Sequence, residues 1–130
     1  LFLTEDKPPA GADMRPNFGG FADRIRAYFE GDIQALETLP VAPPGTPFQQ
    51  EVWKTLRQVG PGSTVSYGEL AKRVGRPDAS RAVGMANARN PVALVIPCHR
   101  VIGSNGKLTG YAYGLDRKRW LLRHEGALLL

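Results

Sequence analysis

Cys98 is the residue best suited to chemistry in this sequence, and it is the only cysteine. A thiolate is a strong nucleophile at neutral pH, and neighbouring cations favour the thiolate over the thiol. His99 and Arg100 follow Cys98 directly. A single cysteine excludes both an intramolecular disulfide and a Cys-x-x-Cys redox pair. Cys98 is therefore either a reactive nucleophile, which the adjacent His-Arg pair favours, or a small buried apolar residue, the commoner use of a free cysteine.

The composition indicates a basic protein of one compact domain. The chain has 130 residues, of which 42% are hydrophobic, enough to form a core. Seventeen Lys and Arg residues against twelve Asp and Glu give a net charge of +5, which is typical of nucleic-acid binders and also of a basic, solvated surface. No apolar stretch is long enough to span a bilayer. An unpaired cysteine fits a reducing compartment, so we expect a cytoplasmic, nucleoid-associated monomer with no membrane partner.

Residues 1–43 are predicted to be the end of a preceding domain followed by a linker. The chain begins with Leu-Phe-Leu instead of methionine, as the end of a strand from an upstream region would. Residues 1–20 are rich in proline and glycine, and they predict that strand end and a loop. Apolar residues at i, i+4, i+7 and i+8 predict a helix over 21–30. The proline-rich residues 38–46 predict an extended linker.

Four helices are predicted in residues 44–130. The first is introduced by a capping box of Thr46 and Gln49. Two short helices then flank a glycine-containing turn, which is the pattern of a helix-turn-helix. Any helical hairpin gives this pattern, so DNA binding and a purely structural role both stay open on the pattern alone. The predicted helices lie between Thr46 and Gly60, over 66–74, over 79–88 and over 116–125.

Cys98 is expected between two segments with β character. Residues 92–96 are apolar throughout and predict a buried extended segment that leads into the cysteine. Asn105-Gly106 lies between short apolar arms, which is a strong hairpin signal. After a helix-turn-helix, such a hairpin over 101–109 would form a wing.

Four short sequence motifs of this chain occur together, and in the same order, in one protein family. They are Ser66-Tyr67-Gly68-Glu69, Arg81-Ala82-Val83-Gly84, Asn90-Pro91 and Pro97-Cys98-His99-Arg100-Val101. In this order they resemble the O6-alkylguanine-DNA alkyltransferases, over about residues 44–126 and more weakly over 18–43. The resemblance implies a mostly α (α+β) fold, in which 44–130 form a winged helix-turn-helix domain for catalysis and DNA binding. Residues 1–43 would be a truncated remnant of an N-terminal α/β domain.

The resemblance also implies a function, which is DNA repair by direct transfer of an alkyl group to the protein. The group would move from O6 of guanine, and in some cases O4 of thymine, in double-stranded DNA to Cys98. The thioether product has no obvious route to hydrolysis, so each molecule would react once. No cofactor is implied, because the damaged DNA is itself the donor. No metal is expected either, since Cys98 and two histidines are the only soft ligands.

The resemblance assigns the catalytic roles to four residues. The Cys98 thiolate would form through a water-mediated relay to His99, which Glu125 supports. Asn90 matches an asparagine that braces the turn before the cysteine segment. Without the family pattern, Glu125 would be a surface residue at a helix end and Asn90 an ordinary turn residue.

The expected DNA contacts lie on the two short helices. Tyr67 matches a tyrosine that helps to turn the target nucleotide out of the duplex, and Arg81 matches the side chain that fills the gap left behind. Taken alone, Tyr67 would be a half-buried helix aromatic and Arg81 a phosphate contact or a solvated charge. The family docks its second helix in the minor groove, where readout is degenerate. The predicted DNA-binding residues are Tyr67, Arg81, Ala82, Gly84 and Arg89.

The guanine pocket is expected to use mainly backbone groups. The carbonyls of Cys98 and Val101 would accept from the exocyclic amine, and a backbone N–H near Ala112 would approach O6. Tyr113 stands where many family members have glycine, so it either narrows the pocket or swings outward to stack on DNA. The predicted pocket residues are Pro97, Val101, Tyr111, Ala112 and Tyr113.

Three other functions fit parts of the sequence. Alkyltransferase-like proteins bind lesions without transfer, but they typically carry tryptophan in place of the acceptor cysteine, and Cys98 argues against this sensor role. In a Cys-His hydrolase, adjacent Cys98 and His99 would be poorly placed for a direct thiol–imidazole bond. A winged-helix transcription regulator would need no reactive thiol and would bind DNA sequence-specifically.

Overall fold

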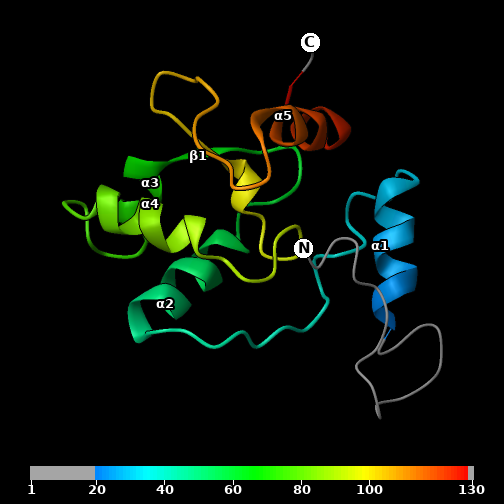
Figure 1. Ribbon diagram of the computed structural model, residues 1–130, viewed down its shortest axis with the longest axis horizontal. Helices are drawn as coiled ribbons and strands as arrows, with labels where there is room; N and C mark the ends of the chain where they lie inside the picture. The colour runs from blue at the N-terminus through cyan, green and yellow to red at the C-terminus, as the bar shows by residue number, and fades with distance from the viewer. Residues whose placement is uncertain (1–19, 129–130) are drawn as a thin grey trace.

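The computed structural model describes residues 20–128, so the strand end expected at the start of the chain lies outside the described residues. Helices α2, α3 and α4 gather at one end of the molecule and α1 lies at the other (Figure 1). None of the helices in the described range is long and apolar enough to cross a membrane. The elements are α1 (Phe21–Phe29), α2 (Pro47–Leu56), β1 (Val65–Ser66), α3 (Tyr67–Arg73), α4 (Ser80–Ala88), the 3-10 helix η3 (Cys98–Arg100), β2 (Val101–Ile102) and α5 (Leu115–His124).

Local capping sets where α2 and α3 begin, whereas α4 and α5 begin without a side-chain cap. The Gln49 backbone N–H donates to Thr46 Oγ1 at 3.1 Å, and the Thr46 N–H donates to Gln49 Oε1 at 3.0 Å. These two bonds confirm the predicted capping box at the start of α2. Ser66 caps α3 in the same way, by accepting from the Glu69 N–H at 3.0 Å. The mostly helical fold class, with helices over the four predicted stretches, is confirmed.

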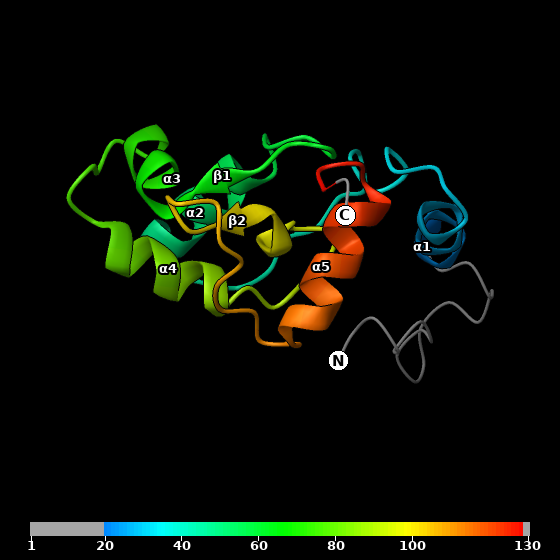
Figure 2. The same cartoon turned by 90° about the horizontal axis from the view of Figure 1, so that it is seen from above.

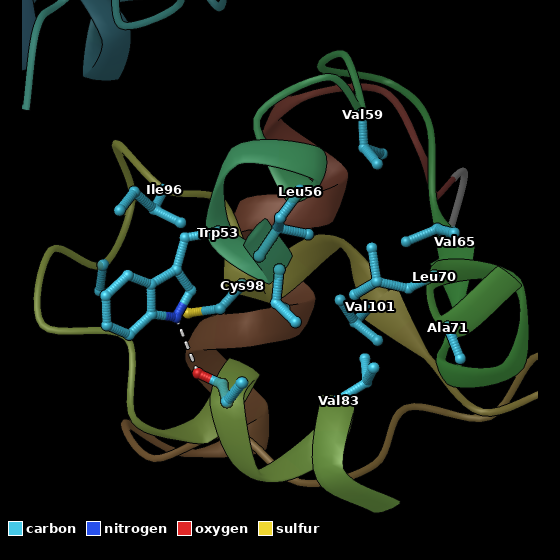
Figure 3. Packing of buried hydrophobic residues seen from close by; sticks show 13 residues of the cluster. Trp53, Leu56, Val59, Val65, Leu70, Ala71, Val83, Ile96, Cys98 and Val101 are labelled. Atoms are coloured by element: carbon cyan, nitrogen blue, oxygen red, sulfur yellow. Dashed lines mark hydrogen bonds between the residues drawn. The ribbon is translucent and has the colours of Figure 1, made fainter. Parts of the chain in front are cut away.

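The helix-turn-helix pair α3–α4 packs on α2 around the main hydrophobic core. Leu56 of α2, Leu70 of α3 and Val83 of α4 are fully buried in this core. Trp53 closes one side of it, and its indole Nε1 donates to the Ala86 carbonyl oxygen at 2.8 Å. Cys98 lies on this Trp53 side (Figure 3). The reactive segment is therefore held against the rigid centre of the domain.

The expected wing hairpin is wrong in its pairing. Asn105-Gly106 does lie in a turn, and Gly106 has the positive φ of 81° that such a turn requires. However, β2 pairs in parallel with β1, in the register Val65↔Val101 and Ser66↔Ile102. One hydrogen bond does join the arms of the expected hairpin, from the Gly103 N–H to the Lys107 carbonyl oxygen at 2.9 Å. Further out, the carbonyl oxygens of Val101 and Thr109, one on each arm, both accept from Lys118 Nζ.

The apolar segment before Cys98 is buried as predicted, but it is turned and not extended. The Ile96 N–H donates to the Val92 carbonyl oxygen at 3.0 Å, and Leu94 has a φ of 76°. A left-handed conformation costs a leucine about 1–2 kcal/mol, and the complete burial of its side chain offsets this cost. An apolar run indicates burial, but it does not reveal the path of the backbone.

A second, smaller core joins the predicted N-terminal remnant to the rest of the chain. Tyr28, Leu36 and Leu39 are buried against Leu94 and Leu121. Helix α1 lies beside α5 in this region (Figure 2). Residues 39–46 then run as the expected extended linker to α2. The predicted boundary at 43/44 therefore falls in a linker, although side-chain contacts cross from one side of it to the other.

Candidate active site

A cavity of about 470 Å³ opens beside Cys98 and is the setting for the candidate chemistry. Gly84 of α4 faces the Tyr67 ring, and a Cβ at this position would make an ordinary van der Waals contact with the ring at 3.6 Å. The Thr109 hydroxyl donates to Tyr67 Oη at 3.4 Å on the opposite rim. The lining residues are Tyr67, Gly84, Asn87, Ala88, Asn90, Cys98, Gly110, Tyr111, Ala112 and Tyr113.

The Cys98 thiol is buried in this wall, with 5% of its surface exposed. Burial raises the pKa of the thiol, while a hydrogen bond from the Asn90 side chain and the positive charge of Lys118 act in the opposite direction. Because burial dominates, Cys98 rests as the thiol at neutral pH. The expectation that His99 and Arg100 supply the cationic surroundings is wrong, because both side chains are bound to Glu125.

Asn90 holds the turn that presents Cys98. Its side-chain Nδ2 donates to the Ile96 carbonyl oxygen at 2.6 Å, and its Oδ1 accepts from the Val92 N–H at 2.9 Å. These two bonds close the loop over 90–96 from within. Asn87 adds a third contact, donating from Nδ2 to the Cys98 carbonyl oxygen at 3.4 Å. Amide side chains therefore fix the backbone on both sides of the cysteine.

A buried ion-pair cluster lies behind the cysteine and centres on Glu125. His99 Nε2 is 2.8 Å from Glu125 Oε2, and Arg100 donates to Oε1 from Nε and to Oε2 from Nη2, each at 2.9 Å. The Tyr28 hydroxyl donates to the same Oε2 at 2.7 Å. Burial would raise the pKa of Glu125, but the hydrogen bonds from His99 and Arg100 lower it to about 2. Glu125 is therefore a carboxylate throughout the physiological range.

The charge of Glu125 decides the proton position on His99. A carboxylate only accepts hydrogen bonds, so Nε2 of His99 must carry the proton and Nδ1 must carry a lone pair. Burial lowers the pKa of His99 against the opposing effect of Glu125, so the ring is neutral at pH 7. Nδ1 has no hydrogen-bond partner among residues 20–128. It is therefore a buried base that can accept a proton.

The predicted DNA-binding residues separate into two groups. Tyr67 and Gly84 line the cavity, whereas Arg81, Ala82 and Arg89 lie on the exposed face of α4, outside it. This outer face also carries Met85, whose side chain is 57% exposed. Helix α4 thus presents one face to the cavity and the core and another to solvent.

The predicted pocket residues are only partly brought together. Tyr111, Ala112 and Tyr113 line the cavity, and the two tyrosine rings meet edge-on with centroids 5.3 Å apart. Of the two positions considered for Tyr113, the structure therefore shows the one that narrows the pocket. Val101 is fully buried in the core and Pro97 precedes η3; neither belongs to the lining residues, which corrects their predicted place.

Comparison with known proteins identifies the family. Residues 47–127 match the model of the 6-O-methylguanine DNA methyltransferase, DNA binding domain. The chain belongs to this family. The methylated-DNA–protein-cysteine methyltransferase of Shigella flexneri is 60% identical over 114 residues, which cover 88% of this chain and 67% of that protein. The predicted family resemblance is thereby confirmed.

Two solved structures of the family extend the comparison to three dimensions. A crystal structure of Mycobacterium tuberculosis OGT in complex with DNA superposes with a TM-score of 0.77 at 49% identity, covering 85% of this chain and 68% of that one. Schizosaccharomyces pombe Atl1, in complex with damaged DNA containing O6-carboxymethylguanine, gives a TM-score of 0.56 at 32% identity, covering 65% and 80%. Both likenesses support the winged helical fold.

Three functional side chains escaped the sequence reasoning. Lys118 is completely buried, and its Nζ donates to the carbonyl oxygens of Val101 at 2.5 Å and Thr109 at 2.6 Å. Burial lowers the pKa of Lys118 to about 8. Asn87 and Tyr28 were likewise missed, since one stands mid-helix and the other belongs to an apolar helix face. No local pattern separates Lys118 from the exposed basic residues around it on α5.

Proposed function

We propose that this protein repairs alkylated DNA by moving one alkyl group from O6 of guanine to Sγ of Cys98. The observation that carries the proposal is the position of the only thiol, in the wall of a cavity and in front of the buried His99–Glu125 pair. The cavity volume of about 470 Å³ lies within the range of about 300–1,000 Å³ that small-molecule sites occupy. An extruded base is a ligand of this class.

The transfer is a displacement at the alkyl carbon. His99 Nδ1, acting through a water, takes the proton of the Cys98 thiol as general base. The thiolate attacks the alkyl carbon, so that the S–C bond forms while the C–O6 bond breaks and its electron pair goes to guanine. The departing guanine anion takes up a proton from water, and the His99 imidazolium returns its proton to water. Overall the thiol exchanges its proton for the alkyl group, which leaves a thioether and repaired guanine.

Glu125 and Asn90 support this step without touching the alkyl group. The Glu125 carboxylate holds the proton on Nε2 of His99 and stabilises the imidazolium that forms when Nδ1 becomes protonated. Asn90 positions the cysteine segment through its bonds to Val92 and Ile96. The carbonyl of Val101 accepts from Lys118 and lies outside the cavity lining, so it is not part of the proposed guanine contact.

Double-stranded DNA containing the lesion is the proposed partner of a monomer. Solved relatives bind DNA, and the net charge of +5 suits a phosphate backbone. Helix α4 would dock through its exposed face, with Ala82 and Arg89 against the minor groove and Gly84 at the cavity. Tyr67 would crowd the phosphate and help to rotate the nucleotide into the cavity, while Arg81 fills the gap. We propose that the protein acts in the cytoplasm, at the nucleoid, where it would meet this substrate.

Intact-protein mass spectrometry tests the proposal directly. After incubation with a duplex containing O6-methylguanine, we expect one added methyl group, mapped to Cys98 and saturating at one per molecule. A duplex containing O4-methylthymine tests the wider substrate range. Cys98→Ser should abolish the mass change while DNA affinity stays near that of the unchanged protein. Comparable transfer in this variant would disprove the assignment of the nucleophile.

A non-catalytic lesion sensor is the second candidate function. The structural likeness to Atl1 bound to damaged DNA favours it, whereas Cys98 at the acceptor position favours transfer. The same mass measurement separates the two candidates. Tight binding to the methylated duplex with no mass change would establish the sensor.

A further inference from the structure

The Tyr28 side chain joins the predicted N-terminal remnant to the catalytic cluster. Tyr28 lies on α1, outside the residues 47–127 that match the family model. It is almost fully buried, with 1% of its surface exposed, and its hydroxyl donates to Glu125 Oε2 at 2.7 Å. Burial and the negative charge of Glu125 both raise the pKa of Tyr28, so the hydroxyl stays protonated and remains a donor.

The position of this bond matters because Oε2 is the oxygen that faces His99. Oε2 accepts from Tyr28 at 2.7 Å, from His99 Nε2 at 2.8 Å and from Arg100 Nη2 at 2.9 Å. The other oxygen, Oε1, accepts from Arg100 Nε. Donors that share one oxygen divide its negative charge, so each weakens the attraction available to the others. The Tyr28 hydroxyl therefore limits how strongly Glu125 can stabilise a protonated His99.

We propose that Tyr28 is a positioning residue for the relay, because its hydroxyl fixes the Glu125 oxygen that binds His99 and withdraws charge from it. The hydroxyl thereby adds to the burial that favours the neutral form of His99 in the resting protein, with Nδ1 able to accept the thiol proton. Arg100 binds both oxygens of the Glu125 carboxylate, one from Nε and one from Nη2. Tyr28 adds a bond to Oε2 from helix α1. The catalytic part of this inference rests on the proposed alkyl transfer.

Several titratable groups surround His99 and Glu125, and all of them except Tyr28 itself are kept when Tyr28 is substituted. The positive charges lower the pKa of His99, and Glu125 raises it. Glu37 lies 3.5 Å from Arg100 Nη2 and compensates part of its charge. The groups around His99 and Glu125 are Tyr28 of α1, Glu37 of the segment after it, Cys98 and Arg100 of η3, Tyr111 of the following loop and Lys118 of α5.

The first test is an NMR titration of the imidazole signals in Tyr28→Phe. Phenylalanine keeps the ring packing and removes only the hydroxyl. The chain has two histidines, so the two signals can be assigned with a single His124→Phe variant. Both proteins carry Cys98→Ser, which removes the coupled titration of the thiol. We expect the pKa of His99 to rise by about half a unit to one unit, the effect of one hydrogen bond.

The second test measures the single-turnover rate of methyl transfer against pH. In Tyr28→Phe the acid limb should move to higher pH by the same half unit to one unit, because His99 becomes protonated earlier. DNA affinity should not change. His124→Phe is the matched control, since His124 Nε2 bonds the Tyr28 backbone oxygen at 2.5 Å and joins the same two helices without touching Glu125.

The outcomes separate the two proposals. The role of Tyr28 is overturned if Tyr28→Phe and the unchanged protein have the same His99 pKa and the same acid limb in their pH–rate profiles. The same shift in His124→Phe would also overturn it, because loosening of the α1–α5 junction would then explain the effect. If methyl transfer fails in the unchanged protein, the proposed function falls. The NMR titration still decides whether Tyr28 controls His99.

Discussion

Glu125→Gln tests whether the buried carboxylate organises this site by its charge. Glutamine has nearly the shape of glutamate, so packing is preserved while the negative charge is lost. Arg100 would then remain buried, with 1% of its surface exposed, and would keep its bond from Nη1 to the Val59 carbonyl oxygen at 2.6 Å. Among the described residues, the Glu37 carboxylate at 3.5 Å would be its remaining ion-pair partner. Removal of one partner from a buried ion pair is strongly destabilising, because it leaves an uncompensated charge. The variant should therefore be less stable than the unchanged protein.

The size of the loss follows from the pKa of Glu125. It falls from its ordinary value of 4.5 to about 2 on folding, and each pKa unit corresponds to about 1.4 kcal/mol. The carboxylate thus contributes about 3 kcal/mol to the free energy of unfolding at pH 7. A depressed pKa gives stability that is complete above the unfolded value and is lost as pH falls toward the folded value. At pH 3, between the folded and unfolded pKa values, roughly half of the contribution should remain.

Urea unfolding, followed by tryptophan fluorescence, measures this difference at both pH values. We expect Glu125→Gln to unfold with about 3 kcal/mol less free energy at pH 7 and with roughly half that deficit at pH 3. The variant should also lose transfer, since glutamine cannot hold the Nε2 tautomer of His99 in the same way. A deficit of equal size at both pH values would refute the electrostatic reasoning, because a purely steric effect does not titrate.

Three further predictions concern the cavity and the DNA face. Arg81→Ala should slow repair in duplex DNA much more than reaction with the free alkylguanine base, since only the duplex needs its gap filled; single-turnover rates on both substrates decide this, and equal slowing would exclude the role. Tyr113→Gly should widen the cavity and raise the rate with a benzyl adduct more than with a methyl adduct, as competition between the two duplexes would show. Lys118→Met should raise the pKa of the Cys98 thiol, because Lys118 lowers it; iodoacetamide should then modify Cys98 more slowly at pH 8, and unchanged kinetics would contradict the proposed charge effect.

Local signals in the sequence predicted the starts of α2 and α3 well, because the residues that begin these two helices act through short-range bonds. Thr46, Gln49 and Ser66 form the caps that their types indicate. The family motifs likewise placed Glu125 with His99, which the spacing of the two residues alone would not. The roles of these side chains can be predicted either from the residues next to them or from the motifs of the family.

The remaining features depend on contacts between distant segments, and no local pattern reports them. Tyr28 and Glu125 are 97 positions apart, and Tyr28 looks like any member of an apolar helix face. Lys118 stands among exposed charged residues of α5, yet its Nζ is buried because two carbonyl oxygens come within reach. Leu94 takes a left-handed turn that an apolar run does not indicate. Each of these positions is decided by tertiary packing.

The burial of Cys98 suits a protein that reacts once. A thiol with a low pKa would be a thiolate at all times and would react with any small electrophile or oxidant that entered the cavity. Burial instead raises the pKa of Cys98, and neutral His99 is the proposed general base that accepts its proton. The thiolate then forms only as the proton is transferred, while an alkylated base fills the cavity. Because each molecule is used up when its cysteine becomes a thioether, selectivity for the correct alkyl donor matters more here than the resting reactivity of the sulfur.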